Sequence, residues 1–117
     1  QAAVLCSDAL QGADGDLLGS PTEQALLTVS LNNGIDIEKV RQEFNRIAEI
    51  PFTSARKRMA TLHHGPDSDH LLLVKGAIER VLPCCSKVAG HDGPVPTQQL
   101  HDAAAALAGN GQRVLAF

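Results

Sequence analysis

Residues 50–59, Ile-Pro-Phe-Thr-Ser-Ala-Arg-Lys-Arg-Met, set an aromatic ring beside the densest basic cluster of the chain. The sequence has no Trp and no Tyr, so a site that stacks a planar base can use only Phe44, Phe52 or Phe117. Phe52 is followed closely by three cations at positions 56–58. A flat apolar ring can stack on a base while cations neutralise phosphate, so this stretch indicates a nucleotide contact. Two other interpretations stay open, a core strand position for Phe52 and a solvated basic edge that discourages strand pairing.

Three further charged residues stand where chemistry is possible. Lys75 ends the apolar run at 71–74 and precedes Gly76, a residue type that lets a ligand or another backbone come close. The alternative for Lys75 is a strand end whose ammonium reaches solvent. Glu23 can turn its carboxylate inward from the first turn of a helix, although the helix-capping box by itself explains this residue completely. Arg113 is either a ligand contact or an exposed charge on an edge strand.

The composition indicates one globular domain over residues 1–117. The chain is 44% hydrophobic and 20% charged, near the average for globular proteins, and its length suits one modest core. Its net charge of -3 and pI near 5.9 argue against a nucleic-acid-binding protein, which would carry a broad basic surface. No apolar run approaches the roughly 18 residues of a membrane span, so the chain as given is expected to be soluble. Because it begins without Met and stops inside an apolar run, we expect a domain excised from a larger protein.

Motifs for catalysis are missing from the sequence. It has no Gly-rich phosphate loop ending in Gly-Lys, no dinucleotide fingerprint, no Gly-x-Ser-x-Gly and no His-Glu-x-x-His, so no catalytic residue is expected. Cys84 and Cys85 with His91 lack the ligand spacing of a zinc site, and the histidines within 63–70 fit an exposed hairpin tip better than a metal site. We therefore expect no metal site. The odd number of cysteines favours a reducing compartment.

The elements that must position the candidate residues form an α+β pattern. Ser20, Pro21 and Glu23 supply a cap, a first-turn proline and a capping-box acid for one helix, and Gly34 supplies its stop. Asp36 can cap a second helix. An antiparallel sheet flanked by helices is therefore expected. The expected helices are 21–32, 36–44, 77–82 and one capped by Thr97 with its body at 103–108, and the expected strands are 46–52, 57–63, 70–76 and 112–117, with a turn at 65–67 inside a hairpin.

Four motifs in order carry a family resemblance. They are Gly-Ser-Pro-Thr-Glu at 19–23, the stretch at 50–59, Lys-Gly-Ala-Ile-Glu-Arg-Val-Leu at 75–82, and Gly-Gln-Arg-Val-Leu-Ala-Phe at 111–117. Together they resemble the nucleotide-binding domain of a type II cation-transporting P-type ATPase, and they cover most of the chain. The His-Pro dipeptide of a heavy-metal pump does not occur. The resemblance implies a cytoplasmic domain of an integral membrane protein, inserted between two halves of a phosphorylation domain.

The resemblance also implies a ligand and a role for each site residue. Phe52 would stack on adenine, Glu23 would reach the adenine amino group, and Arg113 would approach the phosphates. ATP would be the substrate, accompanied by Mg²⁺ in the full-length protein. The domain would present the γ-phosphate to the phosphorylation domain, with that domain and the actuator domain of the same chain as its partners. The phosphorylated aspartate is absent here, so this chain would only bind ATP or ADP. The implied nucleotide-binding residues are Glu23, Phe52, Lys57, Met59, Lys75, Gly76 and Arg113.

Two positions depart from the family pattern. Ile78 stands where proline often follows Lys-Gly-Ala, which removes a helix-start device without touching the lysine. Ser54 stands where calcium-pump relatives can carry an arginine, which removes one phosphate contact. The competing hypothesis for the whole chain is a non-enzymatic α+β interaction domain whose Phe52 and basic cluster dock an acidic partner protein.

Overall fold

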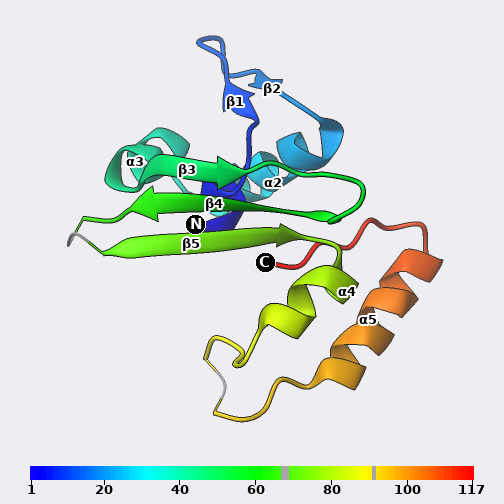
Figure 1. The fold of residues 1–117 in the computed structure, drawn as a ribbon. Coiled ribbons are helices and arrows are strands. Elements are labelled where there is room, and N and C mark those ends of the chain that lie inside the picture. The colour runs from blue at the N-terminus through cyan, green and yellow to red at the C-terminus, as the bar shows by residue number, and fades with distance from the viewer. Residues whose placement is uncertain (67–68, 91) are drawn as a thin grey trace. The chain divides into compact units, whose positions relative to one another are not determined.

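The computed structural model describes residues 1–66, 69–90 and 92–117, and its architecture is α+β with two small antiparallel sheets flanked by helices (Figure 1). Asp67 of the expected turn and His91 lie outside the described residues. The chain divides into two compact units. The first consists of Gln1–Ile50 and Ala60–Leu73, and the second of Pro51–Met59 and Val74–Phe117.

The first unit holds three helices, a short hairpin and most of a three-stranded sheet. In the sheet β4 lies between its two neighbours, and Figure 1 shows β5 running opposite to β4. Strand β4 begins in the second unit, and strand β5 ends there. The elements are α1 (Ala2–Leu5), β1 (Leu10–Gln11), β2 (Leu17–Leu18), α2 (Pro21–Asn32), α3 (Ile37–Glu43), β3 (Asn45–Ile50), β4 (Arg58–His64) and β5 (His70–Gly76).

Two helices of this unit begin where the sequence predicts. Ser20 caps α2, its Oγ accepting the backbone N–H of Glu23 at 3.4 Å, and proline occupies the first turn. Asp36 caps α3, its Oδ1 accepting the backbone N–H of Lys39 at 2.9 Å. Each cap satisfies a backbone donor that the helix itself leaves without a partner. These caps fix where both helices start.

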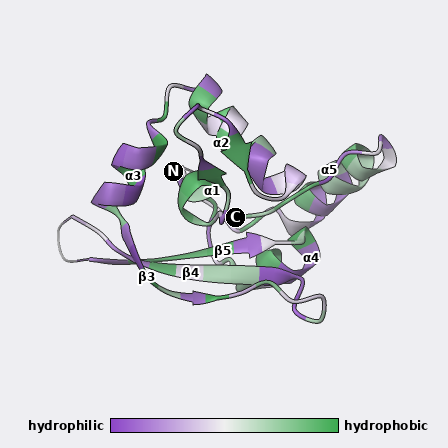
Figure 2. Ribbon diagram, turned by 90° about the horizontal axis from the view of Figure 1, so that it is seen from above, coloured by the Kyte–Doolittle hydropathy of each residue, from purple (hydrophilic) through white to green (hydrophobic). Residues whose placement is uncertain are grey.

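The core of the first unit lies between the helices and one face of the sheet. Leu5 and Leu27 are fully buried there, and Leu71 and Leu73 of β5 pack against this cluster. Figure 2 shows α1, α2 and α3 on one side of the strands. Leu72, which alternates with the two packed leucines, is 61% exposed, so it lies on the opposite face. The full set of core residues is Val4, Leu5, Ala9, Leu27, Ile37 and Val40.

Strands β3 and β4 pair antiparallel with one irregularity. Their register runs from Asn45 opposite His64 to Ile50 opposite Ala60, and it shifts between Arg46 and Ala48. Such a β-bulge adds one residue to β3 and re-aims the side chains next to it. This strand was expected at 46–52, but it ends at Ile50 and contains a bulge that the expected range did not include.

The second unit contains α4 (Ile78–Val81), the 3₁₀ helix η1 (Leu82–Cys84) and α5 (Thr97–Gly109). Helices α4 and α5 contact each other. Thr97 was expected to cap α5, but it is the first helical residue and Pro96 precedes it. The strand expected at 112–117 is also wrong. Only Ala116 forms a bridge, exchanging backbone hydrogen bonds with Gly76 at 2.9 and 3.1 Å, because the rest of this segment has no ladder partner among the described residues.

Candidate functional site

The loop that follows β3 holds Phe52 in an exposed position. A tight turn closes this loop, since the Lys57 N–H donates to the Thr53 carbonyl at 2.7 Å and the Arg56 guanidinium donates to the Pro51 carbonyl at 2.6 Å. Phe52 is 58% exposed. The interpretation of Phe52 as a core strand residue is therefore wrong, because its ring is open to a ligand.

Lys57 stands outside the strand in which it was expected. Its φ of 52° lies in the left-handed region, which is uncommon for a residue with a side chain, and β4 begins only at Arg58. The Lys57 carbonyl accepts the backbone N–H of Ala77 at 2.9 Å, and its Nζ lies 3.5 Å from Glu79 Oε1. About half of each of these two side chains is exposed. The ammonium is thus held near the start of α4 while it stays accessible.

Gly76 is required because the backbone of residues 57–58 lies directly against it. A Cβ at this position would lie 2.4 Å from the Lys57 carbonyl oxygen and 2.6 Å from the Arg58 Cβ. Of the two reasons considered for this glycine, a ligand or another backbone, the structure shows the second. Gly76 therefore sets the distance between β5 and the residues at 57–58.

The remaining predicted residues of the second unit differ in how accessible they are. Lys75 is 6% exposed, which excludes the alternative of a strand-end lysine that reaches solvent. Met59 is 4% exposed and offers little surface to a ligand. Arg113 lies in the exposed segment that follows α5. Of the predicted residues in this unit, Phe52, Lys57 and Arg113 are consequently the exposed ones.

Glu23 belongs to the first unit and already has partners there. Its Oε1 accepts the backbone N–H of Asp8 at 3.2 Å, and its Oε2 lies 3.4 Å from Ser20 Oγ. One of the two hydrogen bonds of a capping box is therefore present. Ser20 accepts the Glu23 amide as a capping box requires, but the carboxylate binds the Asp8 amide and the serine hydroxyl.

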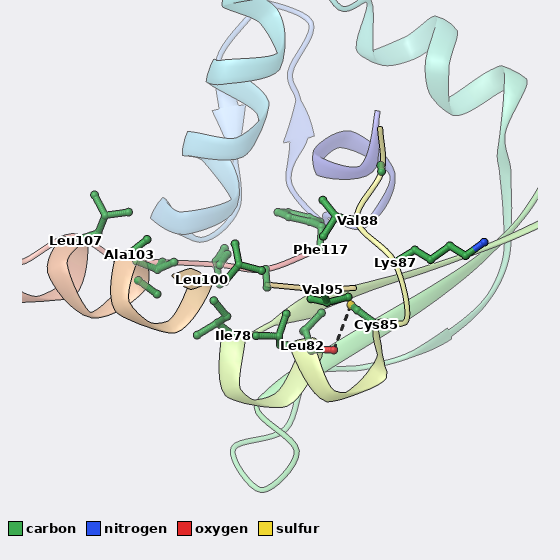
Figure 3. Close-up of a pocket in the computed structure, with 16 residues that line it drawn as sticks. Ile78, Leu82, Cys85, Lys87, Val88, Val95, Leu100, Ala103, Leu107 and Phe117 are labelled. Carbon is green, nitrogen blue, oxygen red and sulfur yellow. Dashed lines mark hydrogen bonds between the residues drawn. The ribbon is translucent and has the colours of Figure 1, made fainter. Parts of the chain in front are cut away.

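A hollow of about 480 Å³ also opens in the second unit (Figure 3). Apolar side chains of α4, α5 and the C-terminal segment line most of it, and in Figure 3 the Lys87 side chain extends outward from them. None of the predicted site residues lines this hollow. Its apolar lining does not suit a triphosphate, so it is separate from the candidate site. Labelled examples of the lining are Ile78, Leu82, Leu100, Ala103, Leu107 and Phe117.

Two polar contacts of the second unit were not predicted from the sequence. Glu79 faces Lys57, and a hydrogen bond from its own backbone amide, together with the Lys57 ammonium, lowers the pKa of this carboxyl. Arg58 donates to the Arg80 carbonyl at 2.6 Å and lies 2.9 Å from Cys84 Sγ. The acid in the first turn of α4 was visible in the sequence, but its pairing with a residue 22 positions earlier was not.

Chemically, the second unit offers a ring for stacking and cations for an anionic ligand. Within residues 1–66, 69–90 and 92–117 no group of three His, Cys, Asp or Glu side chains could hold a metal ion. In the same residues no helix has the length and apolar composition needed to cross a bilayer. Stacking plus local cations suits recognition of an aromatic anion and supplies neither a nucleophile nor a general base.

Comparison with known proteins gives a consistent result. Residues 1–117 match the family described as P-type ATPase, cytoplasmic domain N. The chain is 38% identical to the probable cation-transporting ATPase F of Mycobacterium tuberculosis over 98% of the chain and 13% of that protein. It is 36% identical to a calcium-transporting ATPase of Listeria monocytogenes over 98% of the chain and 14% of that protein. It is 36% identical to the human sodium/potassium-transporting ATPase subunit alpha-2 over 87% of the chain and 11% of that protein. The chain thus spans about an eighth of the length of these relatives.

Proposed function

The chain belongs to the family of P-type ATPase cytoplasmic N domains, and from this membership we propose that it binds ATP, with adenine stacked on Phe52. The parent protein is then an ATP-driven cation transporter of the membrane. The domain delivers the γ-phosphate of ATP to an aspartate on a phosphorylation domain of the same chain. Mg²⁺ arrives with the nucleotide as part of the substrate. The chain described here binds, and the groups that carry out the chemistry lie elsewhere in the parent.

The single observation that carries this proposal is the exposure of Phe52 in a loop that ends at the half-exposed Lys57. A phenylalanine ring that is 58% exposed loses apolar burial unless something covers it, and a purine is a planar partner of suitable size. Stacking of a base on an aromatic ring contributes about 1 to 3 kcal/mol, by analogy with single-stranded nucleic acids. Lys57 lies five positions from this ring and Arg113 follows α5, so both remain candidates for the phosphates.

The other predicted residues differ in whether they are proposed to contact the nucleotide or to support the residues that do. Lys75 is a buried cation, a state that proteins seldom allow without a functional or structural partner. Gly76 serves the site by holding the backbone at residues 57–58 close to β5. Met59 is buried, so in this proposal it acts through packing and not through a large contact with the nucleotide. Glu23 supplies an acceptor for the adenine amino group.

Weak binding follows from this role. A domain that must release ADP in every cycle gains nothing from tight binding of the ground state, and affinity in the millimolar range is expected.

The competing hypothesis is a domain that binds an acidic partner protein. Such a partner would contact the same ring and cations but would not require a purine.

Replacement of Phe52 by Ala separates the two hypotheses. We expect the variant to lose about 1 to 3 kcal/mol of ATP-binding free energy, because the stacking surface is removed. We expect its unfolding free energy to change by less than about 0.5 kcal/mol, because the ring is exposed. Calorimetric titration with ATP and thermal unfolding measure the two quantities. Phe117→Ala, which removes a ring that is 45% exposed in the same unit, is the control and should bind ATP as the wild type does. A wild-type chain that binds no ATP while it binds acidic peptides would favour the competing hypothesis.

A further inference from the structure

Two arginines of the first unit hold the loop that follows α1 through its backbone carbonyls. The loop residues Ser7 and Ala9 are buried, so their carbonyl groups need partners that helices and strands do not supply here. Charged guanidinium groups are strong donors for this purpose. Arg41 Nη2 donates to the carbonyls of Ala9 at 2.8 Å, Ser7 at 3.2 Å and Val4 at 3.3 Å, and Arg46 Nη2 donates to those of Leu5 at 2.8 Å and Ser7 at 2.9 Å.

Arg46 also binds two carboxylates with its second nitrogen. Its Nη1 lies 2.6 Å from Asp8 Oδ1 and 3.0 Å from Glu49 Oε2. Residues 46 and 49 would point to opposite faces of a regular strand, but the bulge between Arg46 and Ala48 brings them to the same face. Partial burial disfavours the charged guanidinium, yet the hydrogen bond and charge of Asp8, with those of Glu49, outweigh this effect and raise the pKa of Arg46.

Asp8 links this arrangement to Glu23. Its carboxylate faces Arg46, while its backbone N–H donates to Glu23 Oε1 at 3.2 Å. The second oxygen of Glu23 lies 3.4 Å from Ser20 Oγ. The rotation of the Glu23 carboxylate therefore depends on where the Asp8 amide is held, and Arg46 holds that residue from the other side. These two contacts restrict the rotamers open to the half-buried Glu23 side chain.

We propose that Arg46 and Asp8 are positioning residues that fix the Glu23 carboxylate for recognition of the adenine amino group. The inference rests on the proposed function, and it extends that function by naming the groups that make the site selective for adenine over other purines. A fixed carboxylate accepts a hydrogen bond from the 6-amino group of ATP. It faces a carbonyl oxygen instead in inosine triphosphate, which cannot donate at that position.

The test compares ATP with inosine triphosphate. We expect the wild type to bind ATP roughly 3- to 10-fold more tightly, the range for one net hydrogen bond. Glu23→Gln should reduce this preference to near unity, and Arg46→Gln should reduce it to a similar extent. The double variant should show no further loss, since both changes act on one contact. Arg46→Lys keeps one cation near Asp8 but loses the forked geometry, so its preference should be intermediate.

A structural role alone would give a different pattern. Val40→Ala removes part of a core residue that is 8% exposed in the same unit, and it controls for lost stability. It should weaken folding while the ratio of the two affinities stays at the wild-type value. The backbone amide resonance of Asp8 is a second readout that needs no nucleotide. It should move in both Glu23→Gln and Arg46→Gln.

The outcomes of this test are distinguishable. An Arg46→Gln variant that is folded and keeps the full preference for ATP would overturn the inference and leave the proposed function intact. An unmoved Asp8 amide in Arg46→Gln would overturn it as well. A wild-type chain that binds neither triphosphate would contradict the proposed function, and the inference would fall with it.

Discussion

Position 76 has no room for a side chain larger than the hydrogen atom of glycine. The Lys57 carbonyl oxygen occupies the space that a Cβ would need, at 2.4 Å. The residue before it, Lys75, is buried at the end of a strand, so backbone strain at Gly76 would act directly on a predicted site residue. The sequence shows a glycine at position 76. It does not show whether this glycine makes room for a ligand or for another segment of backbone.

Gly76→Ala is expected to destabilise the chain by about 1 to 3 kcal/mol, because an overpacked position forces the backbone at residues 57–58 to move. Chemical denaturation measures this change. Gly109→Ala is the matched control, since a Cβ there meets nothing within 4 Å and alanine favours a helix. It should be neutral or slightly stabilising. Equal effects of the two changes would contradict the role given to Gly76.

Glu79 is expected to compete with the nucleotide for Lys57. Glu79→Gln removes the charge that lies 3.5 Å from the Lys57 ammonium, so ATP affinity should rise about two- to threefold, within the range of an exposed ion pair. Stability should change by less than about 0.5 kcal/mol, because both side chains are half exposed. Glu38→Gln makes the same change in net charge at an exposed position of α3 and should leave affinity unaltered. The increase should vanish when Lys57 is replaced by Met, and an unchanged affinity of Glu79→Gln would refute the competition.

At the scale of elements, local signals predicted the helices of the first unit well. Ser20 and Asp36 bind the donors that a cap should bind, because a cap is a contact over three residues and needs no tertiary information. The buried face of α2 depends on more than such local contacts. Leu27 is fully buried, but Leu31 is 37% exposed and Ser30 is buried in its place, since the helix packs on the side chosen by its neighbours.

Long-range features of the elements could not be predicted. The bulge at residues 46–48 depends on the register with β4, and the left-handed backbone of Lys57 depends on a turn whose closing bonds are not encoded in residue type. The exposure of Phe52 is a feature of the same kind, because the strand ends at Ile50 and Phe52 lies in the loop that follows. The sequence therefore indicated Phe52 as a candidate for stacking, but it could not indicate that this residue is exposed.

Strand β4 contains a buried histidine that should make stability depend on pH. The Phe44 carbonyl can only accept, so His63 Nδ1 donates to it at 3.1 Å, and Nε2 is buried without a partner among the described residues. Burial is the main cause that lowers the pKa of His63, and the charge of Arg46 lowers it further. The unfolded chain therefore binds the proton more readily than the folded one, and stability should fall as pH drops below the ordinary histidine value of about 6.5.

This dependence can be measured as the melting temperature between pH 7.5 and pH 5. His63→Gln should flatten the decrease relative to the wild type, even where the variant is less stable overall. His101→Gln, in α5 of the second unit, is the control and should keep the wild-type slope. A wild-type slope in His63→Gln would show that other groups cause the acid sensitivity.

At the scale of the whole molecule, the composition of the chain agrees with a binding role. A net charge of -3 leaves the predicted cations as a local feature, which suits one small anion better than a long polyanion. The predicted residues come from both units, Glu23 from the first and the others from the second. The family could be recognised from the sequence because four motifs occur in a fixed order, whereas composition and periodicity alone gave only an α+β domain.

The most direct test of the central claim is a titration of the 117-residue chain with ATP, followed by the backbone amide resonances of Glu23, Phe52 and Lys75. We expect saturable shifts of all three at millimolar ATP, together with weaker effects from inosine triphosphate. A chain whose spectrum shows that it is folded, and whose three amides do not respond to ATP at these concentrations, would contradict the proposal that this domain binds ATP.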